Sequence, residues 1–385
     1  MATLRSHGVS ATLASLAVVV IFSAAVVVLG GDQALAGPLS CGDTITADTT
    51  LDSDLLDCPN NGIVIGAHDI TLDLNGHTID GDGQLVDPCP EGELCDFGVV
   101  NDGQNGVRIT NGTVRQFATG VVVGGARNVR LAGLASSGNA FFGYLLFDVS
   151  NSVIRDSSGS DNPAPDGDGM GVFASHDIRI VNNSFSRNGL GIHVEDSTNN
   201  LIRGNVISDN EQPGIFMQAD RNEMRRNTCR RNGICILVGP GSRNAIARNH
   251  ARGDVGGIAV EKGRHNVIAR NVVVRVGRTG IFLGVRQFPI GGGSNVVRSN
   301  VVKRSGGDAF QVNRKDDHSV LNHNIARRAG GDGFDVQNDS ARLMNNRAFG
   351  NAGLGIRAVQ GVIDGGGNRA SRNGDPRQCV NIACS

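Results

Sequence analysis

Apolar and polar residues alternate with a period of two in short segments spread along this chain. Many of these segments begin with glycine followed by apolar–x–apolar, as in Gly191-Ile-His-Val, Gly257-Ile-Ala-Val and Gly280-Ile-Phe-Leu. Alternation of this kind is typical of a β-strand and not of a helix. Two more short apolar segments follow each one, with Gly, Asn and Asp at the corners, where positive φ is tolerated. The pattern predicts three short strands per unit.

A short phrase, Asn-x4-Asn, recurs with a period of about 22 residues, as expected for one unit of a solenoid. It occupies residues 200–205, 222–227, 244–249, 266–271 and 295–300. A unit of this length cannot bury its own apolar side chains, so successive units must stack on one another. The repeat therefore predicts one all-β domain, a parallel β-helix of about a dozen coils, roughly 55–60 Å long at the usual strand spacing.

The repeated asparagines have a structural role in this picture. Side-chain amides that lie at successive corners can bond to the coil above and the coil below, forming a ladder inside the solenoid. The predicted rungs are Asn182, Asn205, Asn227, Asn249, Asn271, Asn300, Asn324 and Asn346. Interior rungs cannot contact a substrate, so we do not place a functional site on them.

The N-terminal segment indicates export. An apolar run from Leu13 to Leu29 precedes an Ala-x-Ala signal at Ala34–Ala36, and such a run is typical of a signal peptide, with an uncleaved anchor as the alternative. We expect a signal peptide at 1–36, an N-terminal cap at 37–61, the β-helix at 62–374 and a disulfide-clipped tail at 375–385. The mature protein is then secreted or at the cell surface, with no membrane segment after cleavage.

Eight cysteines fit an oxidising compartment, and they fall into close pairs. The expected disulfides are Cys41–Cys58, Cys89–Cys95, Cys229–Cys235 and Cys379–Cys384. Zinc binding is the alternative. It is disfavoured because the sequence contains no Cys-x2-Cys pair and no histidine at finger spacing.

The Gly-Ile-x-Val and Asn-x-Ile-x-x-Asn units resemble the right-handed parallel β-helix repeats of the pectate-lyase-like superfamily, including the NosD-type and the carbohydrate-binding and sugar hydrolase repeat proteins. The resemblance covers roughly Gly62–Gly374. It implies a right-handed β-helix with three short parallel sheets. It does not imply one activity, because the superfamily contains lyases, hydrolases, C5-epimerases, adhesins and repeat proteins without enzymatic activity.

The outward positions of the first strand of each coil are where a site on such a rod is expected. The expected outward column is His193, Phe216, Cys235, Ala259, Phe282, Gln311, Asp335 and Arg357, with Glu195, Gln218, Glu261, Asn313 and Gln337 two residues further on. Polar groups concentrate in the last coils. The candidate catalytic residues are Asp335, Asp332, Asp308, Arg314 and Arg357, and the candidate substrate-binding residues are Gln311, Asn313, Lys315, Gln337, His193 and Glu195.

Carboxylates carry the catalytic hypothesis. Asp308 and Asp332 stand in equivalent Gly-Gly-Asp-x-Phe units, so they could hold a cation or divide acid and base roles, whereas a corner Asp that caps the next turn is the structural alternative. An enzyme acting on uronates needs Ca²⁺ or a basic clamp beside a base. Ca²⁺ is therefore the one candidate cofactor, with its ligands unassigned. The Asp335 segment lacks the nearby histidine of the epimerases, and Asp316–Asp317 is expected to be a solvated corner.

Charge is sorted along the chain although the net charge is only −1. Residues 1–178 contain 6 Lys/Arg against 21 Asp/Glu, whereas residues 179–385 contain 30 against 16. In a solenoid this order becomes position along the axis, so one end is acidic and the other basic. Arginine suits polymers that bear carboxylates or phosphates.

These features favour an exported monomer that binds an anionic polysaccharide, and not nucleic acid, which an exported protein rarely meets. A lyase or C5-epimerase acting on uronate polymers is the alternative, and a purely structural surface rod is the second alternative. The absence of Trp and the single Tyr disfavour a neutral-sugar binder, although Phe216 and Phe282 could serve as stacking platforms if they face outward.

Overall fold

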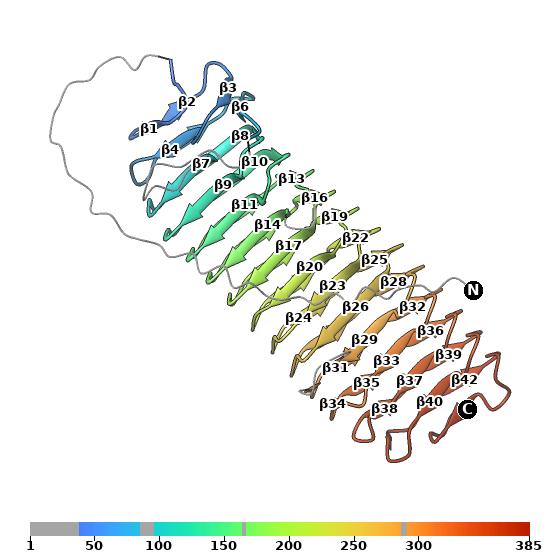
Figure 1. The fold of residues 1–385 in the computed structure, drawn as a ribbon. Coiled ribbons are helices and arrows are strands. Elements are labelled where there is room, and N and C mark those ends of the chain that lie inside the picture. The colour runs from blue at the N-terminus through green and yellow to red at the C-terminus, as the bar shows by residue number, and fades with distance from the viewer. Residues whose placement is uncertain (1–37, 85–95, 164–166, 286–290) are drawn as a thin grey trace.

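The chain is an elongated β-solenoid in the computed structural model, which describes residues 38–84, 96–163, 167–285 and 291–385 (Figure 1). Every regular element in these ranges is a β-strand, and the strand pairings are parallel. The described segments include no helix of the length and hydropathy needed to cross a bilayer. The all-β solenoid expected from the repeat is confirmed.

Each coil contributes one strand to a long sheet, called sheet A here. Among the described residues sheet A has fifteen strands. In spatial order they are β1 (Asp43–Ile45), β4 (Ile63–Ile65), β7 (Phe97–Asp102), β9 (Thr119–Gly124), β11 (Phe142–Phe147), β14 (Asp168–Phe173), β17 (Leu190–Glu195), β20 (Pro213–Gln218), β23 (Ile234–Val238), β26 (Gly256–Glu261), β29 (Ile281–Gly284), β33 (Phe310–Val312), β37 (Phe334–Val336), β40 (Ile356–Ala358) and β43 (Cys379–Val380).

The rest of each coil forms sheet B, which is bent into two limbs. The first limb contains β2 (Thr49–Thr50), β5 (Thr71–Asp73), β12 (Val153–Arg155), β15 (Arg179–Val181), β18 (Leu201–Arg203), β21 (Glu223–Arg225), β24 (Ala245–Ala247), β27 (Val267–Ala269), β31 (Val296–Arg298), β35 (Val320–Asn322), β38 (Arg342–Met344) and β41 (Ile363–Asp364). The second limb contains β3 (Leu55–Cys58), β6 (Thr78–Gly81), β13 (Ser158–Ser160), β16 (Ser184–Ser186), β19 (Val206–Ser208), β22 (Thr228–Arg230), β25 (His250–Arg252), β28 (Val272–Val274), β32 (Val301–Lys303), β36 (Ile325–Arg327), β39 (Arg347–Phe349) and β42 (Arg369–Ser371). The longer strands β8 (Arg108–Arg115) and β10 (Arg130–Ser137) run through both limbs, and β30 (Gly292–Gly293) pairs separately with β34 (Asp316–Asp317).

The solenoid is longer than the dozen coils expected from the glycine-led units. At its N-terminal end β1 pairs in register with β4, and at its C-terminal end β43 pairs with β40. These terminal strands do not begin with the glycine phrase, which is why counting the phrase misses them. Fifteen stacked strands correspond to a rod of roughly 65–70 Å at the usual spacing.

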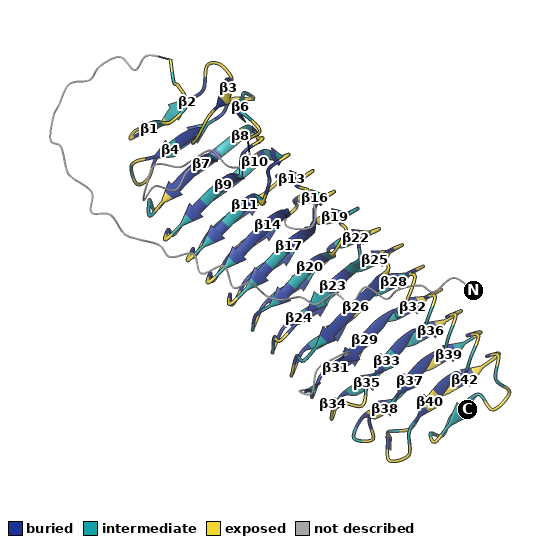
Figure 2. Cartoon of the chain, viewed as in Figure 1, coloured by how far each residue is buried: buried dark blue, intermediate teal, exposed yellow. Residues whose placement is uncertain are grey.

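The core is a narrow column of aliphatic side chains that runs the length of the rod. Along sheet A the inward positions include Val121, Met170, Ile192, Ile215 and Phe310, all almost fully buried. Burial follows the strands, whereas exposed residues gather at the corners (Figure 2). The alternation of inward apolar and outward variable residues explains the period of two in the sequence.

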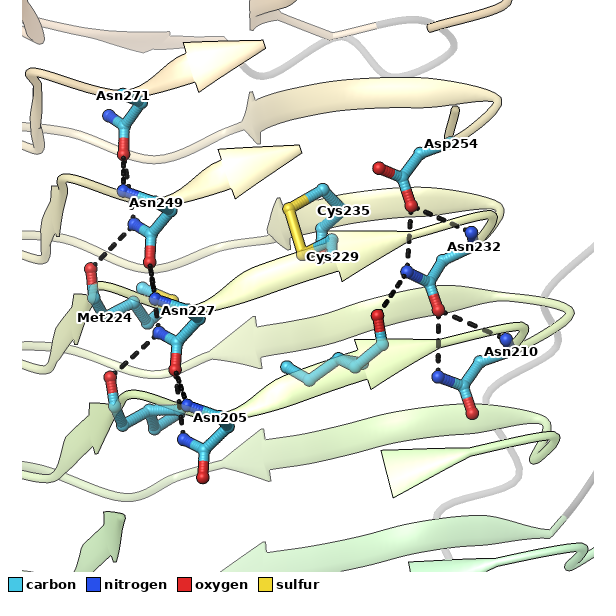
Figure 3. Close-up of a disulfide and its surroundings, with 12 residues drawn as sticks. Asn205, Asn210, Met224, Asn227, Cys229, Asn232, Cys235, Asn249, Asp254 and Asn271 are labelled. Carbon is cyan, nitrogen blue, oxygen red and sulfur yellow. Dashed lines mark hydrogen bonds between the residues drawn. A yellow bond between two sulfur atoms is a disulfide. The ribbon is translucent and has the colours of Figure 1, made fainter. Parts of the chain in front are cut away.

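Buried asparagine ladders hold the corners together, as predicted, but there are several of them (Figure 3). In the central ladder, the Asn249 Nδ2 group donates to the Met224 carbonyl at 2.9 Å and to Asn271 Oδ1 at 3.0 Å, and the Asn227 N–H donates to Asn249 Oδ1 at 3.0 Å. A second ladder contains Asn200, Asn222, Asn244, Asn266 and Asn295, and a third contains Asn139, Asn162, Asn188, Asn210 and Asn232. The two asparagines of each Asn-x4-Asn phrase thus belong to two different ladders, and one short strand of sheet B lies between them.

One predicted rung is wrong by a single residue. Asn183, and not Asn182, donates through its backbone N–H to Asn205 Oδ1 at 2.8 Å. Asn182 occupies the preceding corner position, where its φ is 57°. Since Asn is one of the few residues that adopts this left-handed conformation readily, two consecutive asparagines could not be told apart by residue type.

Arginines fill many corner positions that normally take Gly, Asn or Asp. Arg275, Arg304 and Arg328, each just past a strand of the second limb, have φ values of 56°, 57° and 56°. A left-handed backbone is unfavourable for a residue with a long side chain. Because the strain recurs at equivalent corners, these positions are candidates for a function that needs a basic side chain there.

Three of the four predicted disulfides lie in the described residues and are confirmed. Cys41–Cys58 ties β3 to the segment before β1 at the N-terminal end, Cys379–Cys384 closes the C-terminal end, and Cys229–Cys235 lies in the core (Figure 3). The expected Cys89–Cys95 pair falls outside the described residues, as do the N-terminal signal and cleavage site. Disulfides at both ends are typical of proteins that fold in an oxidising compartment.

Candidate functional site

The outward column of sheet A follows the predicted order with one correction. The register pairs His193 with Phe216, Phe216 with Leu237, and then continues through Ala259, Phe282, Gln311, Asp335 and Arg357. Cys235 does not belong to this column. It lies inward, where it is fully buried and takes the place that glycine has in neighbouring coils, and its sulfur bonds Cys229. The prediction was wrong because it started the unit at Gly233.

Four of the predicted catalytic residues converge at the C-terminal end of sheet A. The backbone N–H of Asp332 donates to Asp308 Oδ1 at 2.6 Å, and the Leu354 N–H donates to Asp332 Oδ1 at the same distance. The Arg357 guanidinium donates to Asp332 Oδ2 at 2.6 Å. Asp308 and Asp332 therefore cap the following coil, as in the structural alternative, while their side chains stay on the outer face of the sheet.

Asp335 completes this carboxylate cluster, defined as Asp308, Asp332, Asp335 and Arg357. Its neighbours in register are Gln311 and Arg357, and Gln337 Nε2 donates to its Oδ2 at 2.7 Å. Burial, followed by the charges of Asp335 and Asp332, raises the pKa of Asp308, whereas the bond to Asp332 raises the pKa of Arg357. Carboxylates in unlike environments could divide acid and base roles.

Apart from Gln311 and Gln337, which lie beside Asp335, the remaining predicted site residues lie away from this cluster. Arg314 and Lys315 occupy the turn after β33, where the Arg314 carbonyl accepts a bond from Asn338 Nδ2 at 2.7 Å. Asn313 packs against Gly284 of the preceding coil. His193 and Glu195 are on β17, far along the rod from β33.

The structure corrects the expectation that Asp316 is solvated, and it bears on the candidate Ca²⁺ site. Asp316 is not solvated: its side chain is buried, bonds Ser319 and accepts from Asn295 Nδ2 at 2.9 Å, and burial raises its pKa to about 6. Ser319 in turn ends the second asparagine ladder, because its Oγ accepts from the Asn295 N–H at 3.0 Å. Within the described ranges, no group of three or more His, Cys, Asp or Glu side chains could hold a metal ion, so we assign no Ca²⁺ ligands.

A basic groove on another face of the rod was not predicted. It is a cavity of about 460 Å³ on the second limb of sheet B, across four consecutive strands, β25, β28, β32 and β36. We define the basic groove by the residues that line it: His250, Arg252, Val274, Arg275, Lys303, Arg304, Arg327 and Arg328. It combines the last residues of four strands and His250, the first residue of β25, with the arginines of the corners.

No acidic residue is among the described residues that line the basic groove. Arginines at equivalent corners of earlier coils are neutralised, as shown by Arg187 with Asp161 and by Arg231 with Asp209. From Arg252 toward the C-terminus, the described residues that line the basic groove include no acidic partner for the arginines. Burial, followed by the charges of Arg252 and Arg230, lowers the pKa of His250, because both burial and nearby positive charge disfavour the protonated imidazole.

The register places like charges side by side near this groove. Arg230 is the partner of Arg252, and Lys303 is the partner of Arg327. Like charges directly opposite one another destabilise a sheet, so an anion between them would relieve a repulsion. The doublets Lys303-Arg304 and Arg327-Arg328, one coil apart, were a usable sequence signal for the groove.

Comparisons with known proteins agree on the fold. A family model described as "Right handed beta helix region" matches residues 51–189, 97–221 and 174–290, together more than half of the chain. Comparison with curated proteins by sequence found no match.

Similar solved structures include the mannuronan C-5 epimerase AlgE6 A-module of Azotobacter vinelandii, with 13% identity, a TM-score of 0.52, and coverage of 85% of this chain and 90% of that chain. A mutant of the periplasmic alginate epimerase AlgG has 14% identity, a TM-score of 0.51, and coverage of 86% and 77%. DFA-IIIase from Arthrobacter chlorophenolicus A6, in complex with GF2, has 11% identity, a TM-score of 0.50, and coverage of 69% and 67%. At such identities the likeness concerns the fold alone.

Proposed function

The chain belongs to the right-handed β-helix family, and on that premise we propose that it is an exported, monomeric protein that binds an anionic polysaccharide in the basic groove. The single observation that carries this proposal is the groove lining, which contains six Arg or Lys side chains and, among the described residues, no acid. A surface of this kind attracts polyanions through fields that its own carboxylates do not cancel.

The geometry of the basic groove suits a polymer better than a small anion. Its cations recur from coil to coil, as Arg275, then Lys303 with Arg304, then Arg327 with Arg328, at the strand spacing of about 4.8 Å. A linear chain with one carboxylate per sugar, lying parallel to the rod axis, would place successive charges against successive coils. Arginine adds a fork of donors that bonds a carboxylate through two oxygens.

Retention on immobilised polymers tests the proposal. We expect the mature protein to be retained by pectate or alginate at low salt and released as salt is raised, because the contacts are ionic. A neutral polymer coupled to the same matrix is the control for nonspecific adsorption. Absence of retention on every polyanion at low salt would leave the structural surface rod as the better account.

The carboxylate cluster supports a second candidate function, an enzyme that acts on uronate polymers. The favouring observation is that Asp308, Asp332, Asp335 and Arg357 meet on one outer face, with the pKa of Asp308 raised. Incubation with pectate, alginate and glycosaminoglycans, with and without Ca²⁺, tests it by the absorbance of an unsaturated product and by the epimer ratio. Asp335→Asn should abolish any turnover while leaving retention in the basic groove unchanged.

A further inference from the structure

A row of rings covers the outer face of sheet A in the middle of the rod. It consists of Phe142 on β11, Phe173 on β14, His193 on β17 and Phe216 on β20, and we call it the aromatic row. The ring centroids are 6.0 Å apart for Phe142–Phe173, 5.0 Å for Phe173–His193 and 5.3 Å for His193–Phe216. The row is contiguous across four coils and shares no residue with the basic groove or the carboxylate cluster.

Two of the rings lie down on the sheet. Gly171 occupies the outward column between Leu145 and His193. A Cβ at this glycine would lie 2.6 Å from a ring atom of Phe173 and 2.7 Å from one of Phe142. The rings therefore fill the space above the glycine, and they offer a broad apolar surface where a side chain would otherwise stand.

Hydrogen-bonding groups border the aromatic row. Asp168 Oδ2 lies 3.3 Å from His193 Nδ1, and Glu195 Oε2 lies 3.7 Å from His193 Nε2. Gln218 follows Glu195 in register on the next coil. An apolar platform with a few convergent polar groups at its border is the usual composition of a ligand site.

Two polar atoms of this border have no hydrogen-bond partner among the described residues. His193 Nε2 and Gln218 Nε2 are both buried and form no hydrogen bond, and the acceptor recorded near His193 Nε2 is Glu195 Oε2, at 3.7 Å. Buried polar groups are nearly always paired in folded proteins, so an unpaired one calls for an explanation. These two atoms lie on adjacent coils beside the same rings, so a ligand hydroxyl that draws either side chain outward would complete its bonding.

The charge of the border decides which saccharide fits. Among the described residues, the charged groups paired with the aromatic row are Asp168 and Glu195, both with His193, and carboxylates repel uronates and phosphates while accepting bonds from hydroxyls. We propose that the aromatic row binds an uncharged saccharide, whose ring faces pack on Phe173 and Phe216 and whose hydroxyls bond Glu195 and Gln218. The small number of aromatic residues in the chain does not prevent this, because the fold gathers them in one place.

This site is independent of the proposed function and is tested separately. Isothermal titration at high salt, with cello-, xylo-, manno-, laminari- and chito-oligosaccharides and inulin as probes, should detect binding of at least one of them. Phe216→Ala should lower the affinity about tenfold, in line with the loss of one ring contact. Gly171→Val should act similarly, because the new side chain displaces Phe142 and Phe173.

Three variants keep the result interpretable. Phe216→Tyr preserves the ring and should bind normally. Val122→Ala changes the same outward column outside the aromatic row, and Arg327→Ala changes only the basic groove, so both should also bind normally. The proposal is overturned if no neutral probe binds, if Phe216→Ala and Gly171→Val bind like the unmodified protein, or if salt abolishes the binding. Retention on polyanions can succeed or fail without affecting any of these outcomes.

Discussion

Lys303 and Arg327 are direct register partners on the parallel strands β32 and β36, so two positive charges face each other across one strand spacing. A sheet gains nothing from this arrangement, since like charges directly opposite are destabilising. Both residues line the basic groove. The pair is best explained as a cost in stability that is offset when a polyanion lies over it.

Lys303→Glu should therefore separate stability from binding. The new carboxylate faces Arg327, so the free energy of unfolding should rise by about 0.5–1 kcal/mol as a repulsion becomes an attraction. Retention on a polyanion should fall at the same time. Urea denaturation and affinity electrophoresis measure the two effects.

Arg179→Glu is the matched control, because it makes the same change of charge on β15, where the register partners are Val153 and Leu201. It should leave retention nearly unchanged. Equal loss of retention in both variants would show that net charge, and not the groove, governs binding.

Asp254 ends the third asparagine ladder, and it should make stability depend on pH. Its Oδ1 accepts from Asn232 Nδ2 at 2.8 Å, its Oδ2 is buried with no partner among the described residues, and burial raises its pKa to about 6. A carboxyl whose folded pKa lies above its usual value binds more protons when folded, so stability falls as pH rises from about 4 to about 6. The loss is about 3 kcal/mol for this one group.

Asp254→Asn should remove most of that loss at neutral pH, because an amide stays uncharged and can donate where the carboxylate cannot. Urea denaturation at pH values on either side of the window checks this, and the variant should be more stable than the unmodified protein only at the upper pH. Asp316, whose pKa is also raised to about 6, retains its own pH dependence in the variant. A variant that is equally stabilised at both pH values would show that the burial of charge is not the cause.

The central ladder should be costly to interrupt. Asn249→Ala removes the acceptor of the Asn227 N–H and the donor to Met224, leaving buried groups unpaired at a cost of about 2–4 kcal/mol. Asn322→Ala, on the outer side of β35, removes only the bond that Asn322 Oδ1 accepts from Asn345 Nδ2 at 3.3 Å, and should change stability by less than about 1 kcal/mol. Comparable losses in the two variants would mean that the ladder contributes little.

The fold was predictable because each coil repeats the same solution to one packing problem. The glycine-led strands and the asparagine phrase carry that solution in residue type and spacing alone. Errors arose where two adjacent residues satisfy the same rule, as at Asn182 and Asn183, or where a unit begins with the wrong glycine, as at Gly233. Residue type does not resolve such one- or two-residue shifts, whereas hydrogen-bond register does.

The sites were less predictable for a different reason. Asp308, Asp332 and Asp335 could be grouped because they recur at related strand positions in adjacent coils. The basic groove combines strand ends with corner positions, such as Lys303 with Arg304, and its corner arginines adopt a left-handed backbone that residue preferences disfavour. Only the stacking of coils shows that they converge and that no acid is among the described residues of the same lining.

The salt dependence of polyanion binding tests the central claim most directly. The comparison is between the unmodified protein and a variant that combines Lys303→Gln, Arg304→Asn, Arg327→Gln and Arg328→Asn, where asparagine is chosen because it tolerates the left-handed corners. The slope of log affinity against log salt counts ionic contacts. We predict that the variant loses affinity at low salt and that the magnitude of its slope decreases by about three. An unchanged slope, with the polysaccharide still bound, would contradict a binding site in the basic groove.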